Sequence, residues 1–161
     1  MNYASIRTCD IANGEGVRVT LFVSGCTHRC TGCFNPDQWS FDYGEPFSRE
    51  VEDRILKDLE PSFIAGLTIL GGEPMEPANQ AALVPFLRRV RERFGDTKTV
   101  WVYTGCVLET ELRAPSRWRT DLTDEFLSLV DVLVDGPFVE SLKDISLRFR
   151  GSSNQRILRL R

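Results

Sequence analysis

Hydrophobic and polar residues alternate most regularly between Val17 and Val23, where every second position is apolar. A period of two is that of a β-strand, because successive side chains of a strand point to opposite faces. Ser24 and Gly25 end the alternation. The pattern therefore predicts a strand over residues 17–23 that leads into a loop.

Short apolar runs recur further along the chain and are typical of strands that are buried on both faces. Three such runs lie at residues 67–70, 99–104 and 131–135. A last extended piece is expected at residues 147–150. The chain therefore contains at least four segments with the pattern of a buried or half-buried strand.

Helical spacing of apolar residues appears between these strands. Ser48 and Asn79 are the expected N-caps of two helices, because their side chains can accept hydrogen bonds from free backbone amides. Gly95 is the expected stop of the second helix. The predicted helices lie between residues 48 and 61, between residues 79 and 95, and around residues 124–129.

Strands that alternate with helices at a spacing of roughly 30 residues indicate βαβ units and a parallel sheet. A closed eight-unit barrel typically needs about 250 residues, and this chain has 161. We therefore expect a single α/β domain over residues 1–161, a partial, open (β/α) barrel of about five to six units with a mostly parallel sheet. A flat doubly wound sheet fits the same pattern.

Charge and composition narrow the possible partners. The net charge of −3 at pH 7 gives no bulk attraction to nucleic acid. No stretch approaches the roughly 20 apolar residues of a membrane span, and the N-terminus lacks a basic-then-apolar signal. Five cysteines, three of them tightly clustered, favour a reducing compartment over a disulfide framework. We expect a cytoplasmic protein without nucleic-acid or membrane partners.

Cys26, Cys30 and Cys33 place three thiolates within eight residues, directly after the first predicted strand. An iron–sulfur cube needs four ligands, so three protein thiolates would leave one iron open to another molecule. The alternative is a structural zinc site in a non-enzymatic module, with His28 as the fourth ligand of a Cys₃His set. Such sites usually combine two ligand pairs from separate turns, which makes iron–sulfur the favoured interpretation.

Loops that follow the ends of parallel strands open on one face, which carries the site in α/β folds. On this basis we expect the three thiolates to share a rim with Glu73, Asp135 and Cys106. The segment Gly71-Gly72-Glu73-Pro74 exposes backbone groups beside a carboxylate, which could receive the ammonium group of an amino-acid ligand. Cys106 itself could be a bystander, a redox-sensitive thiol or a fourth cluster ligand.

The C-terminal segment from Leu147 carries five arginines and no acidic residue. A solvated basic end is the default interpretation of such a segment. Docking of an acidic partner or an anionic ligand is the alternative.

The spacing Cys-x₃-Cys-x₂-Cys resembles the signature of radical S-adenosylmethionine enzymes. Together with its surroundings the match becomes closer, and the chain resembles the family of activating proteins of anaerobic ribonucleoside-triphosphate reductase. The matching segments span nearly the whole chain in order, at residues 13–18, 21–35, 71–74, 101–105, 132–138 and 150–155.

The resemblance implies a 4Fe-4S cluster on Cys26, Cys30 and Cys33, with S-adenosylmethionine chelating the open iron. These cysteines would be both the metal ligands and the catalytic residues. Reductive cleavage of S-adenosylmethionine would give a 5'-deoxyadenosyl radical, which takes hydrogen from a glycine of the large reductase subunit and leaves a glycyl radical. The implied partners are that subunit and a reductant such as flavodoxin.

The resemblance also implies which residues contact S-adenosylmethionine. Gly32, Cys33 and Phe34 would lie against the cofactor, and the loop formed by Gly71, Gly72, Glu73 and Pro74 would hold its methionine amino group. Two alternatives use the same chemistry: activation of another glycyl radical enzyme, or modification of a free metabolite. The chain has neither the extra cysteine clusters of many other activases nor their greater length.

Overall fold

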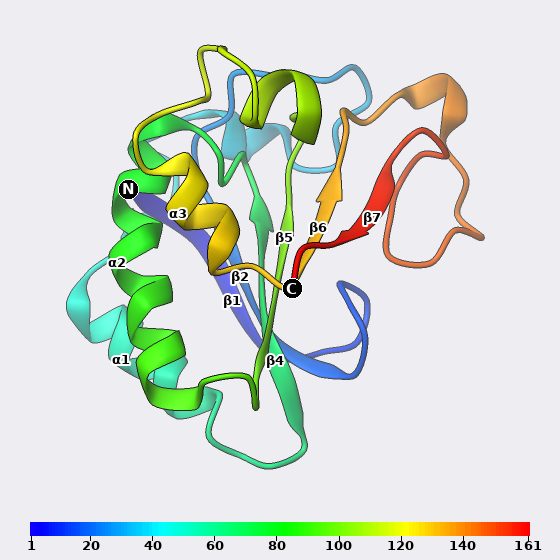
Figure 1. Cartoon of the computed structure of the whole chain (residues 1–161). Helices are drawn as coiled ribbons and strands as arrows, with labels where there is room; N and C mark the ends of the chain where they lie inside the picture. The colour runs from blue at the N-terminus through cyan, green and yellow to red at the C-terminus, as the bar shows by residue number, and fades with distance from the viewer.

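A computed structural model describes all residues, 1–161, as a seven-stranded sheet with three α-helices. The strand order is β3-β1-β2-β4-β5-β6-β7 (Figure 1). The strands are β1 (Asn2–Asp10), β2 (Val17–Val23), β3 (Glu45–Pro46), β4 (Ile64–Gly71), β5 (Thr99–Tyr103), β6 (Val132–Asp135) and β7 (Arg156–Arg159), and the helices are α1 (Arg49–Asp58), α2 (Pro77–Phe94) and α3 (Thr123–Ser128).

The centre of the sheet is formed by β2, β4, β5 and β6, which run parallel. One α-helix lies between each strand of this group and the next along the chain. The open α/β fold expected from the sequence is thereby confirmed, although three βαβ units form the parallel part instead of five to six. Because β2 and β4 pair in register up to Val23 and Gly71, the loops that follow them emerge side by side.

Antiparallel strands flank the parallel part on both sides and make up the rest of the sheet. β1 pairs with β2 at one side, and β7 pairs with β6 at the other. The prediction of an extended segment at residues 147–150 is wrong. These residues lie in a loop, where Phe149 has a φ of 57°, and the strand forms at residues 156–159 instead. There, Asp135 and Arg156 stand opposite each other in the ladder.

The three helices cover one face of the sheet (Figure 1). The alternation in β2 sorts its side chains accordingly, because Val19, Leu21 and Val23 belong to the main hydrophobic core with residues of α1 and α2. The intervening residues, such as Arg18 and Thr20, are buried on the other face of the sheet. No helix has both the length and the apolar character that crossing a membrane requires.

Arg18 fills the interior at the start of the parallel strands, with a side chain that is among the most buried in the protein. Its guanidinium donates to Thr68 Oγ1 at 2.6 Å and to the Thr99 carbonyl oxygen at 2.9 Å, and it lies over the ring of Trp101. Loss of water around the guanidinium lowers the pKa of Arg18 to about 10. Arg18, a polar residue in the β2 pattern, is therefore an interior residue and not a solvent-exposed one.

The two expected N-caps have different outcomes. Ser48 caps α1 by accepting a hydrogen bond from the Val51 amide, as predicted. α2 begins earlier than expected, at Pro77, where a proline in the first turn needs no amide partner. Asn79 therefore lies inside the helix and its side chain is free to bind elsewhere.

Candidate functional site

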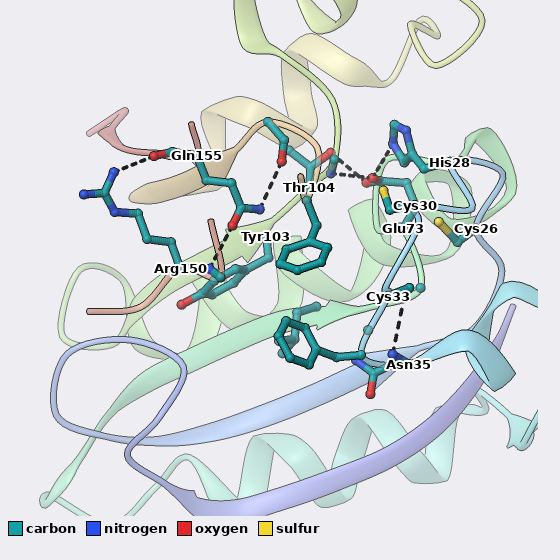
Figure 2. A pocket seen from close by; sticks show the side chains of 18 of the residues that line it. Cys26, His28, Cys30, Cys33, Asn35, Glu73, Tyr103, Thr104, Arg150 and Gln155 are labelled. Carbon is teal, nitrogen blue, oxygen red and sulfur yellow. Dashed lines mark hydrogen bonds and ion pairs between the residues drawn. The ribbon is translucent and has the colours of Figure 1, made fainter. Parts of the chain in front are cut away.

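A pocket of about 360 Å³ opens where the loops after the parallel strands meet (Figure 2). Its walls come from the cysteine loop after β2, the Gly71–Pro74 loop after β4, the Thr104–Gly105 turn after β5 and the segment 136–155. These are the loops that the sequence places at the carboxyl ends of the strands. The predicted gathering of the site at this edge is confirmed for most of the segments.

The three clustered cysteines all line this pocket. Cys26 is buried, whereas Cys30 and Cys33 are half-buried. The loop winds tightly, because Gly32 adopts a φ of 72° and the Cys33 amide donates to the Cys30 carbonyl oxygen at 3.2 Å. The Asn35 amide in turn lies 3.4 Å from Cys33 Sγ. Three sulfur atoms are thus presented to one cavity from a single loop.

The donor set suits an iron–sulfur cluster with three protein ligands. Burial and the nearby carboxylate of Glu73 raise the pKa of the Cys26 thiol to about 11, so a metal must displace its proton when it binds. Thiolates are the usual ligands of iron–sulfur clusters, and a cube with three of them keeps one iron for another ligand. The residues present therefore fit the group that the sequence implies.

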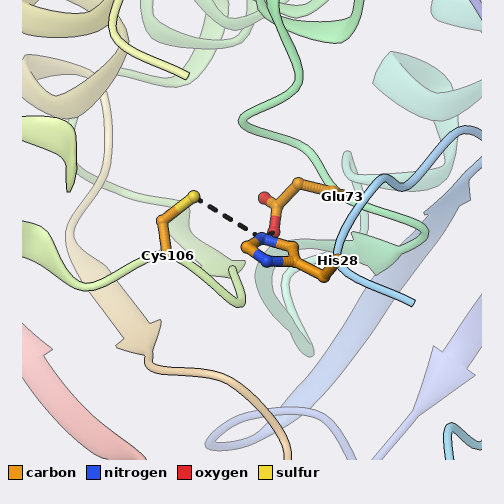
Figure 3. A group of neighbouring side chains, drawn as sticks. All are labelled: His28, Glu73 and Cys106. Carbon is orange, nitrogen blue, oxygen red and sulfur yellow. Dashed lines mark hydrogen bonds and ion pairs between the residues drawn. The ribbon is translucent and has the colours of Figure 1, made fainter. Parts of the chain in front are cut away.

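His28 is engaged with a buried carboxylate near the pocket (Figure 3). Its Nε2 lies 2.8 Å from Glu73 Oε2 and 3.6 Å from Cys106 Sγ, and its ring stacks on Trp118 with centroids 4.6 Å apart. Burial lowers the pKa of His28, but the Glu73 carboxylate more than offsets this and raises it. This geometry does not favour the Cys₃His zinc alternative.

Glu73 has a side chain that is only 1% exposed, and its carboxylate is surrounded by donors. Oε1 accepts from the Met75 amide at 2.8 Å and from Thr104 Oγ1 at 2.7 Å. Oε2 accepts from the Gly105 amide at 2.8 Å, in addition to His28. The carboxylate thus joins three loops of the pocket, and each of its oxygens already has two partners.

The Gly71–Gly72 turn approaches the cysteine loop more closely than side chains would allow. A Cβ at Gly72 would lie 2.6 Å from the Gly25 carbonyl oxygen, and that oxygen accepts the Glu73 amide at 2.8 Å. The carbonyl oxygen of Gly72 itself accepts no hydrogen bond from another residue of the chain. A backbone acceptor is thereby left available in a wall of the pocket.

Asn79 in α2 and Glu76 in the turn before it bind backbone groups of the site loops, and the sequence pattern predicts neither contact. Asn79 Nδ2 donates to the carbonyl oxygens of Ser24 at 3.0 Å and Glu73 at 2.9 Å. Glu76 Oε1 accepts from the amide of Thr27 at 2.7 Å. The available signal in the sequence was a polar residue, Asn79, in the first helical turn after a Gly-Gly loop.

The arginine-rich segment forms a pocket wall in part, which its default interpretation as a solvated end did not include. Gln155 Oε1 accepts from the Gly151 amide at 2.8 Å, and the Gln155 carbonyl accepts from Arg150 Nη1 at 2.7 Å (Figure 2). Phe34, which is 62% exposed, packs against Phe138 with ring centroids 5.1 Å apart, and both rings lie beside Gly151 of this segment.

Asp135 and Cys106 differ from the rim that we expected. Asp135 is fully buried and does not line the pocket, because its carboxylate turns to Arg156 and to the amide of Leu108. Cys106 lies beside His28 and is also fully buried, and burial raises the pKa of its thiol well above the usual range. The bystander interpretation of Cys106 is therefore the one that its surroundings favour.

Comparison with known proteins agrees with this donor set. Residues 12–158 match the family model described as a 4Fe-4S single cluster domain. The chain is 48% identical over 161 residues to the anaerobic ribonucleoside-triphosphate reductase-activating protein of Pasteurella multocida (strain Pm70), covering 99% of this chain and 98% of the relative. The chain belongs to the family of anaerobic ribonucleoside-triphosphate reductase-activating proteins.

Two other members of this family cover a similar share of the chain. The protein of the same description from Escherichia coli (strain K12) is 43% identical over 163 residues, with all of both chains covered. The one from Enterobacteria phage T4 is 37% identical over 157 residues, covering 98% of this chain and 93% of the relative. The family resemblance seen in the sequence motifs is confirmed over the full length.

Proposed function

We propose that this protein activates anaerobic ribonucleoside-triphosphate reductase by forming a glycyl radical on its large subunit. The observation that carries the proposal is the placement of Cys26, Cys30 and Cys33 around one pocket that the Gly71–Pro74 loop also lines. This combination joins a three-thiolate cluster site to a site for an amino-acid ligand. Full-length membership of the family supports the same activity.

The cofactors would be a 4Fe-4S cluster on the three cysteines and S-adenosylmethionine at its open iron. When bound, the reduced cluster and S-adenosylmethionine together supply one-electron cleavage of the sulfonium bond and a 5'-deoxyadenosyl radical that takes a hydrogen from glycine. The protein's part is to hold the reactants in a fixed geometry and to exclude water from them.

Each pocket wall has a specific task in this proposal. The carbonyl oxygen of Gly72, which has no partner in the chain, would accept from the methionine ammonium, while Gly71 and Pro74 shape the loop around it. Cys33 and Phe34, which line the pocket, would lie against the rest of the cofactor. Gly32, which precedes them and does not line the pocket itself, would complete this part of the cysteine loop. Glu73 would support the loop through its buried carboxylate.

Access to the pocket suits a protein substrate. Phe34 lines the pocket and is largely exposed, so an apolar side chain is accessible at the pocket directly after the third cysteine. A glycine-bearing loop of the large subunit would enter there. A cytoplasmic flavodoxin or similar one-electron donor would supply the reducing equivalent.

The proposal is tested with anaerobic protein reconstituted with iron and sulfide. After reduction in the presence of S-adenosylmethionine, we expect 5'-deoxyadenosine to form, and addition of the large reductase subunit should give the EPR doublet of a glycyl radical. Cys30→Ala is the control, which should give neither signal.

Two outcomes would count against the proposal. A colourless protein that holds one zinc ion would contradict the cofactor assignment. Formation of 5'-deoxyadenosine without the EPR doublet would instead indicate that the substrate is another glycyl radical enzyme or a free metabolite.

A further inference from the structure

The Glu73 carboxylate is a meeting point of three loops that the cluster ligands do not explain. Its four donors are the Met75 amide, Thr104 Oγ1, the Gly105 amide and His28 Nε2, at 2.7 to 2.8 Å. Of these, only His28 comes from the cysteine loop. A buried carboxylate is stable when each oxygen has donors, and here His28 completes the set.

The residues around His28 hold its imidazole in place against the Glu73 carboxylate. A Cβ on Gly105 would lie 2.8 Å from the His28 ring, so a glycine is what lets the imidazole reach the carboxylate. On the other face the ring stacks on Trp118, and Arg117 lies over Trp118 in turn. With an exposed fraction of 11%, the imidazole side chain has little freedom to turn.

The cluster of His28, Glu73 and Cys106 is a poor candidate for a metal ion, although its ligand atoms all lie within 4.8 Å of one another. Glu73 Oε2 already has donors from Gly105 and His28 at 2.8 Å. A metal would need to displace a backbone amide from a buried site, which would leave that amide unsatisfied. A hydrogen bond between His28 and Glu73 satisfies the carboxylate without this loss.

We propose that His28 is a positioning residue that ties the cysteine loop to the Gly71–Pro74 loop through the Glu73 carboxylate, which acts as a shared acceptor and does not bind the ammonium group of S-adenosylmethionine. The inference rests on the proposed function for its consequence in cofactor binding. The tie itself is a property of the chain. His28 would set the distance between the iron ligands and the backbone that receives the cofactor.

The first test compares His28→Ala and His28→Gln with Cys106→Ala as the matched control, all as reconstituted protein. Cys106 lies 3.6 Å from the same imidazole nitrogen but gives no hydrogen bond to Glu73. Hydrogen exchange at the Met75 and Gly105 amides reports directly on the tie. We expect faster exchange in His28→Ala, near-normal exchange in His28→Gln, whose amide can donate, and no change in Cys106→Ala.

The second readout is the dissociation constant of S-adenosylmethionine. His28→Ala should keep its iron and weaken cofactor binding about tenfold or more, as supporting hydrogen bonds around metal sites do, and His28→Gln should recover most of the affinity. Gly105→Ala should reproduce the His28→Ala result, because its methyl group displaces the imidazole.

Glu73→Gln separates the two roles of the carboxylate. If Glu73 is the shared acceptor, glutamine cannot replace it, because the side-chain NH₂ would face a backbone N–H donor of Gly105 or Met75. Hydrogen exchange at the Gly105 and Met75 amides should then rise even without cofactor. Altered cofactor affinity with unchanged exchange would make Glu73 an ammonium ligand and overturn the proposal.

Three other results bear on the inference. Unchanged exchange and affinity in His28→Ala would overturn it, and so would loss of iron from that variant, since His28 would then be a cluster ligand. If wild-type protein binds no S-adenosylmethionine, the proposed function fails. The exchange measurements still decide whether the tie exists.

Discussion

Arg156 holds the buried carboxylate of Asp135 with two hydrogen bonds, from Nε to Oδ1 at 2.9 Å and from Nη2 to Oδ2 at 2.5 Å. The two residues face each other across the β6–β7 ladder. Asp135 Oδ2 also accepts the Leu108 amide at 2.9 Å. One ion pair therefore fastens β7, and with it the end of the pocket wall, to the parallel strands.

Arg156→Ala should destabilise the fold by about 2 kcal/mol or more, because it leaves a buried carboxylate with one partner. The matched control is Arg159→Ala. The Arg159 side chain is 71% exposed, and its ion pair with Glu15 is long, at 3.8 Å. Arg159→Ala should lower the free energy of unfolding by less than about 0.5 kcal/mol. Urea unfolding of both apoproteins measures the difference, and equal losses would contradict this role of Arg156.

Gly66→Ala should destabilise the sheet by about 3 kcal/mol or more, since overpacking against rigid backbone is not relieved by a rotamer change. A Cβ at this position would lie 1.9 Å from the Thr99 carbonyl oxygen on the neighbouring strand. Gly151→Ala is the control, because its Cβ would meet the ring of Phe138 at 3.2 Å, which can yield. The midpoint of thermal unfolding should fall clearly more for Gly66→Ala.

Asn79→Asp should be more harmful than Asn79→Ala, although it keeps the shape of the side chain. The Asn79 amide donates to the carbonyl oxygens of Ser24 and Glu73, and a carboxylate there would oppose them. We expect a loss of about 1 to 3 kcal/mol for Asn79→Ala and a larger one for Asn79→Asp. Denaturant unfolding decides the order, and a milder effect of the aspartate would show that the two carbonyl contacts do not govern this position.

Replacement of Cys26, Cys30 or Cys33 by alanine should abolish assembly of the cluster, because two thiolates remain where the site needs three. Cys106→Ala should keep the iron content of the wild type, since that thiol is buried against His28 and away from the pocket lining. Iron and sulfide analysis after anaerobic reconstitution measures both. Loss of iron in Cys106→Ala would indicate that Cys106 is a cluster ligand.

The sequence predicts the parallel part of the fold well, and the reason is burial. Strands such as β2 and β6 are covered on both faces, so their apolar residues form clear runs. The antiparallel strands β1 and β7 have many exposed residues, so selection for apolar side chains is weak there and the pattern is lost. β7 was therefore expected some residues too early in the chain.

The grouping of the three cysteines at one pocket could be predicted because they are local in sequence, whereas the groups that orient the pocket are not. The contact between His28 and Glu73 joins loops from two different strands, and no spacing rule announces it. Asp135 was expected at the rim from its place after a strand, but its side chain turns toward Leu108 and Arg156 instead. Side-chain direction at a strand end is set by tertiary packing.

The antiparallel strands at the two sides of the sheet also affect how copies of the chain meet one another. On one side the outermost strand is β3, which is only two residues long and ends with Pro46, and the β1 ladder beside it is irregular between Tyr3 and Ser5 and again between Arg7 and Asp10. On the other side β7 is only four residues long and begins and ends with arginine. Irregular, short and charged edges are poor templates for pairing with a foreign strand. These flanking strands therefore reduce edge-to-edge aggregation between copies of the protein.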